Sequence, residues 1–215
     1  MELELKKECL DTYELGEPQT LTQEETAETI VPDYCPDIAR IISAEGVVCL
    51  HGGAEQDGVT GTVRVTVLYT PENESGVRAL EFAMPFSAQG EGLAGCAHVV
   101  VETEIELLES RMLNPRKIFT RCKLVTHLAG CRKVCLTISS DAETDPALLV
   151  EKRCCGQTVS LLRQVAEKDL TFSETMSLSL GREGAAELLH CRANGIVTET
   201  KAIGNKLIFK GVFLV

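Results

Sequence analysis

The chain has 215 residues, which is enough for one large domain or two small ones. Hydrophobic residues make up 44% of it and charged residues 25%, so there is apolar material for a core and the composition excludes an intrinsically disordered chain. Acidic residues outnumber basic ones 32 to 21, and the resulting net charge of −11 argues against nucleic acid or an anionic membrane as the partner.

The N-terminus and the lack of a membrane-spanning stretch predict a cytoplasmic protein. Residues 1–8 alternate acidic and apolar side chains and lack the apolar stretch of a signal peptide. No window approaches the roughly 18 apolar residues of a membrane-spanning helix. In a reducing cytoplasm the ten cysteines are expected to stay reduced and not to form a disulfide framework.

Alternation with a period of two dominates the chain and predicts β-strands. Apolar and polar residues alternate over residues 62–69, and again over 99–107, where the polar positions are glutamates. Residues 118–128 and 134–138 predict two more strands joined by a turn, and residues 172–180 another. We therefore expect a mainly β fold of antiparallel, sandwich-like or barrel-like modules.

Two short segments instead follow a helical spacing. Within residues 36–42, Ile38, Ile41 and Ile42 fall at positions i, i+3 and i+4 behind an initial proline. A similar spacing returns within residues 184–189. Each module is thus expected to contain one short helix.

These similarities extend to an internal repeat. Glu28-Thr29 recurs as Glu174-Thr175, an offset of 146 residues, and Gly46 has its counterpart in Gly195, an offset of 149. The small drift is what loop insertions produce, so the sequence predicts a diverged repeat of about 147 residues.

The repeat suggests a division of the chain into three parts. Residues 1–140 are expected to form the first β-domain and residues 141–155 a linker, which is polar and contains a proline. Residues 156–215 are expected to form a second copy that is truncated at its C-terminal end.

Three segments carry a resemblance to a known family. Residues 31–42 read Val-Pro-Asp-Tyr-Cys-Pro-Asp-Ile-Ala-Arg-Ile-Ile, with two Pro-Asp pairs four residues apart, and residues 61–69 and 113–118 add further matches. The chain resembles the SPOCS domain, which is found in clostridial sporulation proteins of the SipL type. The residues of the family signature, expected to have a structural role, are Pro32, Asp33, Pro36, Asp37, Ile38, Ile41, Ile42, Asn114, Pro115, Arg116 and Lys117.

The resemblance implies a non-enzymatic, β-rich module that often precedes a LysM domain. Proteins of the SipL type help to encase the forespore in the spore coat by binding the coat-assembly ATPase SpoIVA. We therefore expect a scaffold or protein-interaction module in spore coat or spore envelope assembly, located in the mother-cell cytoplasm or at the forespore surface. The expected partners are an ATPase of the SpoIVA type and further copies of the chain.

One alternative function stays open at this point. Because relatives often carry LysM, the chain could be a carbohydrate-binding or peptidoglycan-binding β-module. It has no tryptophan and only 4% aromatic residues, whereas sugar binding prefers an aromatic platform. Glycan binding is therefore the second choice.

Several residues are candidates for protein contacts. They are Tyr34 and a local cluster of basic residues, and for each of them a purely structural role is the alternative: Tyr34, Arg111, Arg116, Lys117 and Arg121. Asp33 and Asp37 could pair for acid–base chemistry or hold a cation, but we expect them to start and cap the predicted helix.

The sequence predicts no catalytic, cofactor-binding or metal-binding residues. His127, Cys131 and Cys135 have a four-residue spacing that suggests zinc. In a strand, however, positions four apart are separated by roughly 13 Å, too far for one ion. Cys154 and Cys155, beside the predicted linker, are candidates for cross-linking between neighbouring coat proteins.

Overall fold

The computed structural model describes residues 4–51, 58–143, 151, 153, 155–156, 158–166, 171, 173–175 and 188–215. Over these residues the chain forms antiparallel β-sheets and no helix, which confirms the predicted mainly β fold. The strands are β1 (Glu4–Leu15), β2 (Gln19–Ile30), β3 (Ile38–Leu50), β4 (Gly58–Pro71), β5 (Arg78–Gln89), β6 (His98–Asn114), β7 (Lys117–Glu143), β8 (Asn194–Ile203) and β9 (Lys206–Leu214).

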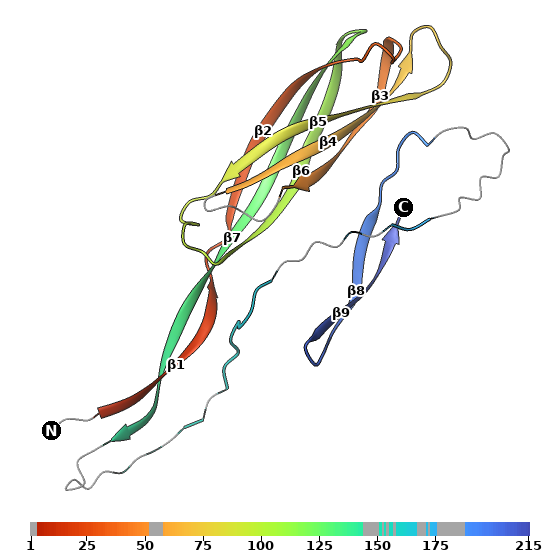
Figure 1. Ribbon diagram of the computed structural model, residues 1–215. Coiled ribbons are helices and arrows are strands. Elements are labelled where there is room, and N and C mark those ends of the chain that lie inside the picture. Colours follow the sequence, from red (N-terminus) through yellow and green to blue (C-terminus); the bar gives the residue numbers. More distant parts are fainter. Residues whose placement is uncertain are drawn as a thin grey trace.

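The long strand β7 organises the first sheet. Its N-terminal half lies between β2 and β6, whereas its C-terminal half pairs with β1 alone among the described strands. The second sheet has the order β3-β4-β5 and packs against β2, β6 and the first half of β7 as a sandwich (Figure 1). We call β1 together with residues 131–143 of β7 the ribbon, because these two strands continue beyond the sandwich (Figure 1).

The core of the sandwich follows from the alternation in the sequence. The apolar positions of β4, including Val63 and Tyr69, are fully buried, as are Ile118 and Leu124 of β7. Each such side chain contributes roughly 1.5–3 kcal/mol by leaving water. The strand predicted over residues 62–69 is confirmed within β4, and this core fixes the ends of the strands from which the loops project.

The short helix predicted over residues 36–42 is wrong, because β3 begins at Ile38. The pairing of β3 with β4 is irregular between Ile38 and Arg40 and between Ile41 and Ser43, so an extra residue is inserted at each place. Ile38 and Ile41 both face the core although they are three residues apart. The apparent helical spacing therefore comes from β-bulges in an edge strand.

Two boundaries also differ from expectation. Residues 118–128 and 134–138 belong to one continuous strand, β7, with no turn between them. The same strand runs to Glu143, so residues 141–143 of the predicted linker are part of a sheet.

The C-terminal part of the structure contains the antiparallel hairpin β8–β9 (Figure 1). One hairpin among the described residues does not support an internal repeat of the whole module. Most of the second predicted helix and of the strand predicted over 172–180 lies outside the described residues. Within the part of the chain that is described, no helix is long and apolar enough to cross a membrane.

Candidate interaction site

The loop between β2 and β3, residues 31–37, is held in place by the side chain of Arg116. We call it the signature loop. The Arg116 guanidinium donates from Nη2 to the carbonyl oxygen of Val31 at 2.8 Å and from Nη1 to that of Cys35 at 2.7 Å. Because a guanidinium is planar and presents its donors in fixed directions, these two bonds fix both ends of the loop.

The same guanidinium also binds both aspartates of the signature. Nη1 lies 3.1 Å from Oδ1 of Asp37 and Nη2 lies 3.1 Å from Oδ1 of Asp33. No helix follows the loop, so the expectation that the two aspartates cap a helix is wrong. Their structural role is instead to hold Arg116, since charge-assisted bonds of this kind are among the stronger ones.

Backbone hydrogen bonds join the two signature segments as well. The amides of Val31 and Ile38 donate to the carbonyl oxygens of Arg116 and Pro115, each at 2.9 Å. The side chain of Asn114 accepts from the Arg116 amide at 2.9 Å, which sets the turn between β6 and β7. The structure therefore brings together two segments that are about 80 residues apart in the sequence; we call these contacts, with the side-chain bonds above, the Arg116 network.

The buried side of the loop rests on Tyr69. The Tyr69 hydroxyl donates to the Pro36 carbonyl oxygen at 3.3 Å. Burial is the main cause that raises the pKa of this tyrosine, followed by its electrostatic interaction with the nearby Cys35. The hydroxyl thus stays a hydrogen-bond donor well into the alkaline range.

The solvent side of the loop presents Tyr34, whose exposed fraction is 87%. Two isoleucines of the signature lie on β3 and not on the loop. Ile38 is fully buried in the core, and Ile42 is half exposed at the edge of the sheet. Tyr34 is therefore a large side chain that packs little against the rest of the sandwich, on a loop whose backbone is fixed. This combination is typical of a contact residue.

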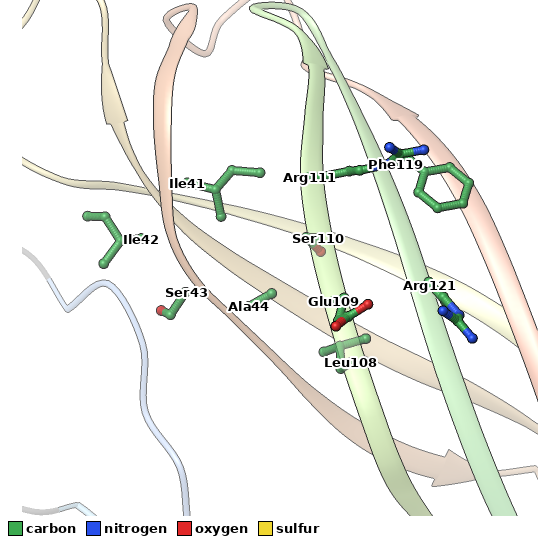
Figure 2. A pocket seen from close by; sticks show the side chains of 10 residues that line it. All are labelled: Ile41, Ile42, Ser43, Ala44, Leu108, Glu109, Ser110, Arg111, Phe119 and Arg121. Carbon is green, nitrogen blue, oxygen red and sulfur yellow. The ribbon is translucent and has the colours of Figure 1, made fainter.

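A groove of about 670 Å³ opens between the edge strands β3 and β6 (Figure 2). Ile41, Ala44 and Leu108 lie between the two strands, as Figure 2 shows. On the β7 side of the groove, the guanidinium carbon of Arg111 lies 5.0 Å from the centre of the Phe119 ring, a cation–π contact. The residues lining it are Ile41, Ile42, Ser43, Ala44, Leu108, Glu109, Ser110, Arg111, Phe119 and Arg121.

The other basic candidates are paired with carboxylates on the strands beside β7. Lys117 pairs with Glu28, and Arg121 binds Glu24 at 2.7 Å. The hydrogen bond to Glu24, and then its charge, raise the pKa of Arg121. Lys117 and Arg121 therefore do not add free positive charge to this surface, because carboxylates of β2 neutralise them.

One expectation about the cysteines is wrong. Cys9 of β1 and Cys135 of β7 form a disulfide across the ribbon, with their Cα atoms 5.6 Å apart. The register of the two strands places both thiols on one face, and periodicity along a single strand does not reveal such a partner. Cys122 is free and buried, and burial followed by the charge of Glu25 raises its thiol pKa to about 11.

The suggested zinc ligands do not come together. Cys135 is in the disulfide, Cys131 is buried, and His127 bonds to the Thr20 hydroxyl at 3.0 Å. No group of three or more His, Cys, Asp or Glu side chains in the described ranges is placed to hold a metal ion. Cys154 lies outside those ranges and Cys155 is exposed.

Comparison with known proteins finds no match among family models, curated proteins or solved structures. The site is therefore described by its own geometry. Sequence reasoning singled out Arg116 and the two aspartates but not their contact, and it missed Phe119. The glutamates that pair with Lys117 and Arg121 do leave a signal, since Glu24 and Glu28 lie on one face of β2.

Proposed function

We propose that the chain is a non-enzymatic scaffold and protein-interaction module in spore coat or spore envelope assembly, acting in the mother-cell cytoplasm or at the forespore surface. The resemblance to the SPOCS domain of SipL-type proteins supports this role. The observation that carries the proposal is that two of the three segments bearing this resemblance, residues 31–42 and 113–118, meet in the Arg116 network.

The proposed contact residue is Tyr34, presented by the signature loop. Tyrosine is frequent among residues that dominate the energy of protein interfaces, because it buries a large area and keeps a polar hydroxyl. Arg116 bonds to the backbone on both sides of Tyr34. The loop is therefore already ordered, and binding a partner costs little further conformational entropy there. The proposed partner is a coat-assembly ATPase of the SpoIVA type.

Titration calorimetry between the purified chain and such an ATPase tests the proposal. We expect binding by the unchanged chain and a loss of at least about tenfold in affinity for Tyr34→Ala, or about 1.4 kcal/mol. Leu15→Ala is the matched control, since Leu15 is 55% exposed on β1 and lies outside the loop. Equal affinity for Tyr34→Ala and the unchanged chain would remove Tyr34 from the interface, and no binding at all would contradict this partner.

Cell imaging tests the proposed location. A fluorescent fusion is expected to gather around the forespore during sporulation, and Tyr34→Ala is expected to leave it spread through the mother cell. Specific binding of purified muropeptides by the chain would instead favour the carbohydrate-binding alternative.

The proposal also includes a second, diverged copy of the module containing the hairpin β8–β9. A Cβ atom added at Gly46 would lie 3.2 Å from a Val63 side-chain carbon, and one added at Gly195 would lie 3.0 Å from the Phe213 ring. Gly46 and Gly195 are 149 residues apart in the sequence, and Val63 and Phe213 are 150 residues apart. In the strand pairing, however, Gly46 lies opposite Val65 and Gly195 lies opposite Phe213, so the proposed common origin of the hairpins β3–β4 and β8–β9 rests on the sequence offsets.

A further inference from the structure

The edges of the sandwich carry features that discourage pairing with another chain. Both β3 and β6 have two irregularities each in their register. Pro85 interrupts the donors of β5, and β2 presents Glu24 and Glu28. Bulges, prolines and charges on edge strands are the usual means by which β-proteins avoid edge-to-edge association.

The ribbon has an edge on which a seven-residue stretch of β7 carries neither a charge nor a proline. Beyond Cys131 no described strand lies along the side of β7 opposite β1, since β6 starts at His98, opposite Cys131. Residues 134–140 read Val-Cys-Leu-Thr-Ile-Ser-Ser, without a charge, a proline or a glycine. The one register irregularity of the ribbon falls at the end of this stretch. Short uncharged segments rich in β-branched residues pair readily when their edge is open.

The two edges of the ribbon also differ from each other. On the β1 side, the Tyr13 amide donates to the carbonyl oxygen of Leu162 at 2.7 Å, and the Thr12 hydroxyl bonds to the same oxygen at 3.1 Å. The chain therefore engages the outer edge of β1 itself. The outer edge of β7 in the ribbon has Leu136 at 41% and Ile138 at 38% exposed.

The charges that flank this edge are self-complementary. Arg132 and Lys133 precede the uncharged stretch, and Asp141 and Glu143 follow it. If two such edges meet antiparallel about a two-fold axis, the basic end of each lies beside the acidic end of the other. Parallel pairing would instead place like charges together. The segment thus matches an antiparallel copy of itself.

We propose that residues 132–142 of β7, which lie beyond the last partner of β6, pair antiparallel with the same residues of a second copy of this chain. The ribbons then join into one four-stranded sheet in the order β1-β7-β7-β1. This proposal deepens the proposed scaffold function, on which it rests, by naming a partner and a surface. A two-stranded ribbon is only marginally stable in water, and a four-stranded sheet removes that weakness.

Sedimentation velocity on the purified chain, from about 1 to about 100 μM, tests the pairing. We expect a concentration-dependent dimer that Ile138→Lys weakens at least about tenfold, since an edge lysine opposes strand pairing. Val47→Lys is the matched control, because Val47 is also an exposed β-branched residue on an edge strand, and we expect it to leave the dimer intact. A monomer at every concentration, or equal loss in both variants, overturns the proposal.

Charge exchange gives a second test that does not depend on the fold tolerating Ile138→Lys. The pairing places Lys133 of one copy opposite Asp141 of the other. Lys133→Glu and Asp141→Lys are each expected to weaken the dimer several-fold, and the double variant is expected to restore it. A double variant no better than the single ones contradicts antiparallel pairing. These sedimentation experiments contain no ATPase, so they test the pairing separately from the proposed partner. A chain that dimerises but does not bind the ATPase refutes only the partner. A chain that binds the ATPase but stays monomeric refutes only the pairing.

Discussion

The two halves of β7 show how partners decide what a strand can do. In the sandwich half, Ile118 and Leu124 are fully buried between β2, β6 and the opposite sheet. In the ribbon half, Leu136 and Ile138 remain more than a third exposed, because only β1 accompanies them. The same alternating sequence therefore supplies core stability in one half and an open edge in the other.

The largest expected difference between the two halves concerns stability. Ile118→Ala removes a fully buried side chain from the sandwich and is expected to lower the free energy of unfolding by about 3–4 kcal/mol. Leu136→Ala trims a side chain that is already exposed and is expected to cost less than about 1 kcal/mol. Denaturant titration followed by circular dichroism measures both values. Similar losses would mean that the ribbon is packed as tightly as the sandwich.

The Arg116 network is expected to make the next largest contribution to the free energy of unfolding, and it lies in the sandwich. Arg116→Ala leaves the carbonyl oxygens of Val31 and Cys35 without these donors, and we expect a loss of about 2–3 kcal/mol. Arg121→Ala is the control: this arginine pairs with a single exposed carboxylate, so its loss should destabilise the fold much less than that of Arg116. The same denaturant titration compares them, and equal losses would remove the special role of Arg116.

The disulfide between Cys9 and Cys135 is expected to act on the ribbon alone. Replacing both cysteines by serine should speed amide exchange in β1 and in residues 131–143 by at least about tenfold, equivalent to about 1.4 kcal/mol of local stability. Exchange in β4 should not change, because its neighbours β3 and β5 are far from the disulfide in the topology. Hydrogen exchange followed by mass spectrometry reports each segment separately.

The control for this measurement is Cys191→Ser, at an exposed free cysteine. It should leave every segment unchanged. If exchange in β4 rises together with that in the ribbon of the double serine variant, the ribbon and the sandwich open as one cooperative unit, and the contrast between the two regions fails.

Sequence patterns predicted the strands well where one face is buried, as in β4, because alternation reports burial directly. They failed where a bulge inserts a residue, and the spacing of Ile38 and Ile41 then imitates a helix. They also failed at Gly130, which we expected in a turn. A Cβ atom at Gly130 would lie 2.5 Å from Cys96 Sγ, so close packing within a continuous strand accounts for the glycine.

The candidate site was predicted in its parts and not in its assembly. The Pro-Asp pairs of the signature loop and the Asn-Pro-Arg turn each stand out locally. Their contact depends on β2 and β7 pairing in one register, which places Ile30 opposite Lys117. The spacing of residues along one strand shows which face is buried, but it does not show which residues of a distant strand lie opposite.

The smallest expected effect on stability comes from an ion pair on the outer face of the sandwich. Lys123 pairs with Glu106 at 2.8 Å, and both side chains are more than a third exposed. Water and salt screen such a pair, so Lys123→Ala should change the free energy of unfolding by less than about 0.5 kcal/mol, and by still less at about 1 M salt. Denaturant titration at both salt concentrations measures this. A loss above about 1.5 kcal/mol would show that charges on this face stabilise the fold, and the sandwich would then depend on more than its core and the Arg116 network.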